Sequence, residues 1–139
     1  MSMIRIIMGD KGSGKTKRLV DLVREAVAEE NGDVVVIEKQ RSLTYDIPFR
    51  ARLVEAGAYD IGSYEFLKGF ICGIHSGNYD ITHFFIDNFF KLVNDKSLSA
   101  FSVFIDWLSA FSDKEKVDFV LSVSADQSSA PENIKKYLI

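Results

Sequence analysis

The sequence predicts an α/β fold in which a mostly parallel sheet carries helices on both faces, giving a three-layer α/β/α domain. Two observations predict this architecture. Runs of apolar and β-branched residues at 3–8, 33–38, 81–87 and 117–124 alternate with longer segments of helical periodicity. These runs are apolar almost throughout, which is typical of strands buried on both faces. Since no linker, repeat or low-complexity segment divides the 139 residues, we expect a single domain over 1–139.

The first strand leads into a helix expected over residues 15–30, with Asn31-Gly32 as its stop signal. One apolar stripe along this helix is formed by Leu19, Val20, Leu22, Val23, Ala26 and Val27. The strand at 33–38 then completes a βαβ unit, whose crossover should be right-handed. Numbering the strands at about 3, 33, 82 and 117 along the chain, we expect the order 1-4-3-2 in the sheet.

The middle of the chain has weaker signals. Residues 39–57 indicate a loop and then a short helix over about 49–55, and a short strand is expected at 58–61. The arginines of this segment belong either to a plain surface connection or to a mobile segment that faces phosphates or a partner. Ser63 is a plausible N-cap for a helix over 64–75.

A helix expected over residues 97–112 is apolar over more than one face. Its core stripe consists of Leu98, Phe101, Phe104, Ile105, Leu108 and Phe111, and Val103, Trp107 and Ala110 widen it. Deep burial explains this width, and so does a surface for a homo-oligomer or a protein partner that uses Trp107. A final helix is expected over 132–138.

The amino-acid composition limits the classes of function that the chain can have. The formal net charge is -3 and the pI is about 5.4, so the chain has no strong electrostatic signal for nucleic-acid binding. Cys72 is the only cysteine, which excludes a disulfide framework and a Cys-rich zinc site. We expect no signal peptide, because the first strand begins by residue 3, and no membrane span. These features predict a cytoplasmic protein.

The most informative stretch follows the first strand, where Gly9-Asp10-Lys11-Gly12-Ser13-Gly14-Lys15-Thr16 fits the phosphate-binding pattern G-x-x-x-x-G-K-[ST]. Glycines 9, 12 and 14 are expected to allow positive φ angles, so that backbone N–H groups, including those of Asp10 and Lys11, turn inward around phosphate oxygens. Lys15 would reach the β- and γ-phosphates of ATP or GTP, and the Thr16 hydroxyl would ligate Mg²⁺.

Asp87 ends the apolar strand at 81–87, where a carboxylate would support the same Mg²⁺. Lys15 and Asp87 are therefore the main catalytic candidates.

Further candidates are Glu38, Asn88 and Ser124. Glu38 ends the second strand as a solvated carboxylate or a base, with Asp126 as another candidate base. Ser124 belongs to a polar cluster, completed by Ser122, Asp126 and Gln127, that either senses the γ-phosphate or is ordinary strand-end polarity. His83 is expected to be a buried, hydrogen-bonded core residue.

The loop at 9–16 together with residues 84–87 resembles the P-loop NTPase superfamily, and the late strand at 117–124 resembles its RecA-like branch. Within that branch the chain is similar to thymidine kinases in three features. These are an Arg-rich helix after Gly-Lys-Thr, Arg41 and Tyr45 after 34–37, and Phe89-Phe90 after Ile86-Asp87. That family has a glutamate where this chain has Asn88, and also a cysteine zinc module and a substrate-holding lasso that this sequence lacks.

The resemblance implies an Mg²⁺-dependent ATP- or GTP-binding protein. Three alternative functions are compatible with such a protein. The first is a small NTPase. The second is a nucleotide-binding regulatory or assembly module that hardly hydrolyses, because Asn88 can orient a water but cannot take its proton. The third is a small-molecule phosphotransferase, such as a nucleoside-type kinase, without the usual substrate lid.

Overall fold

A five-stranded, all-parallel sheet forms the centre of the computed structural model, which describes residues 3–29 and 31–139. Its strands are β1 (Ile4–Gly9), β2 (Asp33–Glu38), β3 (Arg52–Glu55), β4 (Ile81–Ile86) and β5 (Asp118–Ser124). They lie in the order β1-β5-β4-β2-β3. The expected order of the four long strands is confirmed, and β3 extends the sheet beyond β2.

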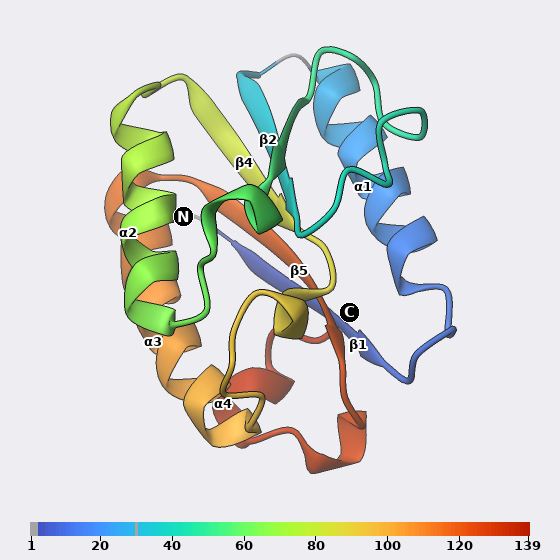
Figure 1. Cartoon of the computed structure of the whole chain (residues 1–139), viewed down its shortest axis with the longest axis vertical. Helices are drawn as coiled ribbons and strands as arrows, with labels where there is room; N and C mark the ends of the chain where they lie inside the picture. Colours follow the sequence, from blue (N-terminus) through green and yellow to red (C-terminus); the bar gives the residue numbers. More distant parts are fainter. Residues whose placement is uncertain (1–2, 30) are drawn as a thin grey trace.

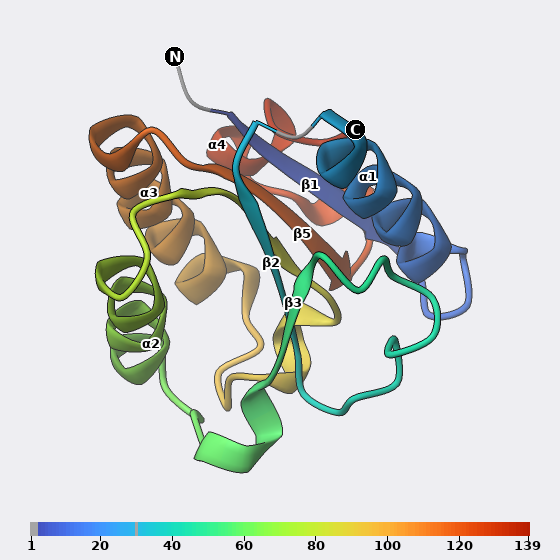
Figure 2. The same ribbon diagram turned by 90° about the horizontal axis from the view of Figure 1, so that it is seen from above.

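Helices cover both faces of this sheet, as the sequence predicts. They are α1 (Lys15–Glu29), α2 (Tyr64–Ser76), α3 (Leu98–Glu115) and the short α4 (Glu132–Lys135), with 3₁₀ turns η1 (Ala56–Tyr59), η2 (Phe89–Lys91) and η3 (Gln127–Ser129). Figures 1 and 2 show α1 on one face and α2 with α3 on the other. Ser63 caps α2 as predicted, because its side chain accepts a hydrogen bond from the Phe66 N–H at 3.1 Å.

The two faces of the strands build two separate cores. Val34 and Val36 pack with α1, whereas Val35 and Ile37 pack with the cluster that contains α2 and α3. Successive residues of a strand point to opposite faces. Since helices cover both faces of the sheet, all four side chains are buried. This double burial explains why the strand at 33–38 is apolar without alternation.

Two predictions in the middle of the chain are wrong. Residues 49–55 do not form a helix, since β3 occupies Arg52–Glu55 and pairs in parallel with β2. The strand expected at 58–61 is replaced by η1 and the turn that follows it. Pairing with a preformed strand is a nonlocal interaction, and it overrides the weak local preference of so short a segment.

The final helix is shorter than expected because the last residues join the sheet instead. The Ile6 N–H donates to the Tyr137 carbonyl at 2.8 Å, and the Ile139 N–H donates to the Ile6 carbonyl at 3.1 Å. Residues 137–139 therefore cover the outer edge of β1, which would otherwise expose unpaired backbone groups.

Burial accounts for the core stripe of α3 but not for its full apolar width, because Val103 and Ala110 are exposed. Phe101, Phe104, Ile105 and Leu108 are fully buried in the core. Trp107 is half-buried between Phe104 and Phe111, with the Lys68 ammonium 5.7 Å from its ring centroid. Trp107 is thus largely covered by its own chain, although Val103 on the same helix remains exposed.

Candidate functional site

The loop between β1 and α1 has the backbone that its glycines allow. Gly12 and Gly14 have φ angles of +84° and +85°, which side-chain-bearing residues rarely adopt. A Cβ atom added at either position would meet nothing within 4 Å, so conformation rather than crowding selects glycine there. The expectation of a positive φ at Gly9 is wrong. A Cβ at Gly9 would lie 2.7 Å from the Ser13 hydroxyl oxygen, so the Ser13 side chain would have to shift.

Lys15 is the first residue of α1 and is almost completely buried, with 7% of its surface exposed. Its ammonium donates to the Asp10 carbonyl at 2.7 Å, which turns the cation back over the loop. The N–H groups of the first turn of a helix have no intrahelical acceptor. The cation and the helix N-terminus therefore combine into a positively polarised region around residues 10–15.

Asp87 brings the second predicted motif to this loop. Asp87 is 1% exposed, and its carboxylate accepts hydrogen bonds from the Thr16 hydroxyl at 3.0 and 3.2 Å, although the two residues are 71 positions apart. This contact forms because the carboxyl ends of β1 and β4 lie at the same edge of the sheet, with β5 between them. The two residues that sequence analysis assigned to Mg²⁺ are thus in direct contact.

Ser122 is a site residue whose role sequence analysis missed. Its hydroxyl is fully buried, donates to Asp87 at 2.5 Å and accepts from the Asn88 N–H at 2.8 Å. The sequence grouped Ser122 with a polar cluster that either senses the γ-phosphate or is ordinary strand-end polarity. Ser122 instead fixes the Asp87 carboxylate and the turn after it.

Asn88 adopts the left-handed conformation, with φ +49° and ψ +56°, where the chain turns from β4 into η2. Asparagine tolerates this region better than most residues, because its short polar side chain bonds locally. Here the side-chain amide donates to Asp87 at 3.3 Å. The left-handed backbone at position 88 therefore favours asparagine there.

Glu38 is neither solvated nor open at the sheet edge. It is buried, and its two oxygens accept from the Ser42 hydroxyl at 2.6 Å and the Leu43 N–H at 2.9 Å. The loop that these bonds anchor places Leu43 in the core beside α1. Glu38 thus holds the start of the loop after β2, and both of its oxygens are already engaged there.

We expect Glu38→Ala to lower the free energy of unfolding by about 1–3 kcal/mol, the cost of leaving a buried donor unsatisfied. Urea denaturation followed by circular dichroism measures this loss. Glu25→Ala is the matched control, because Glu25 is exposed on α1. A loss for Glu38→Ala no larger than that of the control would contradict the anchoring role.

The polar residues after β5 are mostly engaged in the fold. Asp126 caps η3 by accepting from the Ser128 N–H at 3.0 Å, and this bond lowers the pKa of its carboxyl and weakens it as a base. The Gln127 side chain donates to the Met8 carbonyl at 2.6 Å. Ser124 is exposed at the edge, in register with Gly9 of β1.

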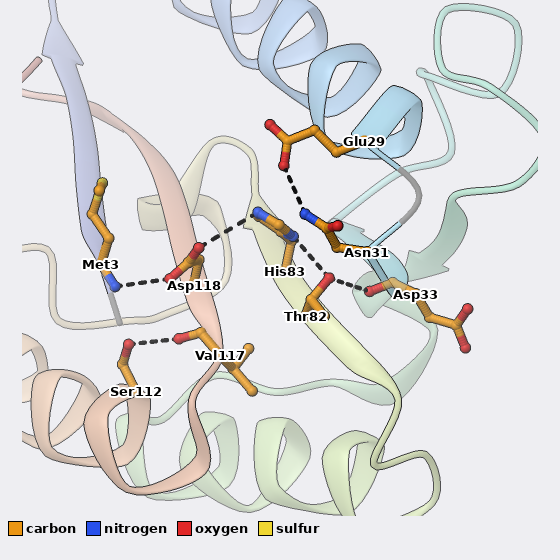
Figure 3. Close-up of polar contacts among 9 residues, drawn as sticks. All are labelled: Met3, Glu29, Asn31, Asp33, Thr82, His83, Ser112, Val117 and Asp118. Carbon is orange, nitrogen blue, oxygen red and sulfur yellow. Dashed lines mark hydrogen bonds and ion pairs between the residues drawn. The ribbon is translucent and has the colours of Figure 1, made fainter. Parts of the chain in front are cut away.

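A second polar cluster lies at the opposite end of the sheet, around a hollow of about 410 Å³ (Figure 3). The His83 Nε2 atom is 3.5 Å from Asp118, and its Nδ1 atom is 2.9 Å from the Thr82 hydroxyl. Asp118 also accepts from the Met3 N–H at 2.8 Å. The hydrogen bonding predicted for His83 is confirmed, but its side chain is half-buried at the hollow, 12% exposed, rather than enclosed in the core.

Burial lowers the pKa of His83 below its ordinary value, an effect that the Asp118 and Glu29 carboxylates oppose and Arg5 reinforces. The unfolded chain therefore binds this proton more readily, so stability should fall as the pH drops below about 6.5 and level off below the folded pKa. Urea midpoints between pH 7.5 and 5.5 measure the slope. His83→Gln should flatten it, and an equally steep slope in this variant would assign the dependence to other groups.

The described residues contain no group of three or more His, Cys, Asp or Glu side chains arranged to hold a metal ion. No helix within 3–29 and 31–139 has the length and apolar character needed to cross a membrane. No protein-family model matches the chain, and no curated protein matches it either.

Proposed function

We propose that this protein binds ATP or GTP with Mg²⁺ as a P-loop NTPase, with the phosphates held by residues 9–16. The observation that carries the proposal is the hydrogen bond between Thr16 and Asp87. Two sequence patterns that were recognised separately meet at the carboxyl edge of a parallel sheet, where ligands bind in open α/β folds. An ordinary glycine turn before a helix would not require this meeting.

The residues present fit the groups that they would hold. The N-terminus of α1 and the Lys15 ammonium are complementary to phosphate oxygens. A hydroxyl and a carboxylate are the hard oxygen donors that Mg²⁺ prefers, and Mg²⁺ usually takes only one or two protein ligands besides phosphate oxygens and water. Thr16 and Asp87 would hold the ion, which would neutralise charge on the phosphates when bound.

A second function has its own support, namely nucleotide binding with little hydrolysis in a regulatory or assembly module. Asn88 stands beside Asp87, and its amide cannot accept a proton from water. The carboxylates of Glu38 and Asp126, the other candidate bases, both accept hydrogen bonds that hold the neighbouring chain in place. Binding thus has stronger support than turnover.

Calorimetric titration with ATP and GTP, in Mg²⁺ and in EDTA, combined with phosphate release, separates these functions. Tight Mg²⁺-dependent binding with steady phosphate release supports the NTPase. Binding without release supports the regulatory or assembly module. Absence of binding to both nucleotides would overturn the proposal as a whole.

We expect Asn88→Glu to raise the rate of phosphate release, because it supplies the missing carboxylate. The same change should lower stability by roughly 1–2 kcal/mol, since position 88 has a positive φ. Asn88→Gln is the matched control, with the same length but no basic group. Release by Asn88→Glu that stays at or below the wild-type rate would contradict the view that a missing base limits hydrolysis.

A further inference from the structure

A cavity of about 360 Å³ adjoins the phosphate-binding loop at the carboxyl edge of the sheet. Lys11 lines it from the loop, Asn88 from the turn after β4, and Ser124 from the end of β5. The proposed phosphate loop and the neighbour of Asp87 thus contribute to one wall. The cavity lies within the size range of small-molecule sites.

Apolar groups form much of the remaining lining, from Phe90, Leu98 and Ala125. The Phe90 ring is fixed by edge contacts with Phe89 and Phe101, whose centroids lie 6.0 and 5.5 Å away. All three lining residues are half-buried, so part of their apolar surface is open to a ligand. This surface suits a flat or aliphatic body.

The charged part of the lining is uniformly positive. It consists of Lys11, Lys91 and Lys96, and the described lining contains no carboxylate. Lys96 is held in place, because its ammonium donates to the Phe90 and Val93 carbonyls at 2.6 and 2.8 Å. Lys91 is the last residue of η2 and is exposed. In a chain of net charge -3, this local excess of cations favours an anionic ligand.

We propose that this cavity is a second ligand site for a small organic acid, a phosphate ester or a carboxylate, with an apolar body. The acid group pairs with Lys91 and Lys11, and the body covers Phe90, Leu98 and Ala125. The position of the site beside nucleotide phosphates rests on the proposed function. The cavity and its lysines do not.

The test uses the full chain and four probes, followed by ¹H–¹⁵N NMR titration. Phenyl phosphate and phenylacetate carry a ring and an acid, benzyl alcohol carries the ring alone, and inorganic phosphate carries the acid alone. We expect both acids with a ring to shift amides at 88–98 and 124–125, and to bind at least about tenfold more tightly than benzyl alcohol. Binding of only one of them would assign the site to phosphate esters or to carboxylates.

Lys91→Glu should weaken probe binding at least about tenfold and leave nucleotide binding intact. Lys114→Glu is the matched control, because it makes the same charge change at an exposed position near the end of α3. Equal effects of the two variants, or equal binding of benzyl alcohol, would overturn the anionic class. A preserved amide spectrum establishes that each variant is folded.

Lys15→Ala separates this inference from the proposed function. Probe binding that persists in this variant, while nucleotide binding is lost, supports both. Probe shifts confined to residues 9–16 and lost in Lys15→Ala would overturn the second site, because the phosphate loop itself would then bind the probes. If the wild-type chain binds the probes but binds neither ATP nor GTP, the proposed function would be overturned and the acid site would still be supported.

Discussion

Lys15→Ala is expected to lower the affinity for Mg²⁺-ATP by about 30- to 1000-fold, because truncating one partner of a buried charge interaction costs roughly 2–4 kcal/mol. The wild-type ammonium is already directed at the loop, through its bond to the Asp10 carbonyl. The nucleotide would meet a cation whose side chain is nine-tenths buried and therefore largely ordered before binding. Calorimetric titration measures the loss.

Two further variants keep this prediction specific. Lys15→Met retains the buried aliphatic stem and removes only the charge, so it should lose nearly as much affinity as Lys15→Ala while preserving the packing of α1. Lys17→Ala removes an exposed cation two positions along the same helix and should have little effect. Affinity that survives in Lys15→Met would place the phosphates elsewhere.

The four long strands could be predicted from sequence because each is buried on both faces. Val34, Val35, Val36 and Ile37 are all buried, so local sequence and tertiary environment favour the same conformation. β3 differs, since Leu53 and Val54 are its only apolar residues and are half-buried. Its conformation is determined by hydrogen bonding to β2, which no local pattern records.

The candidate site divides in the same way. The meeting of Thr16 with Asp87 follows from two motifs and from the rule that parallel strands present their carboxyl ends at one edge. The buried bonds of Ser122 do not follow, because a serine near a strand end gives no sign of whether it faces solvent or a carboxylate. The left-handed backbone of Asn88 is equally hidden, although asparagine is compatible with it.

These hidden features change how the region after β4 is understood. The resemblance to thymidine kinases presents Asn88 only as the replacement of an expected glutamate. In the structure Asn88 donates its amide to Asp87 and its backbone N–H to Ser122, so three adjacent polar groups hold one another in place. Such a network orients the Asp87 carboxylate toward Thr16 before any ligand arrives.

Asp87→Asn should abolish the Mg²⁺ dependence of nucleotide affinity and lower the free energy of unfolding by about 1–3 kcal/mol. The buried carboxylate accepts from Thr16, Ser122 and Asn88, whereas an asparagine amide has a single oxygen to offer these donors. Calorimetry in Mg²⁺ and in EDTA measures the first effect, and urea denaturation measures the second.

Ser122→Ala distinguishes loss of charge from loss of fold. It removes a buried donor to Asp87 and leaves the Asn88 N–H without this acceptor, so it should destabilise the chain by a similar amount, about 1–3 kcal/mol. It keeps the carboxylate, however, and should therefore keep the difference in nucleotide affinity between Mg²⁺ and EDTA. If both variants lost that difference, Asp87 would act through the packing of this edge; if neither lost it, Asp87 would not support the ion.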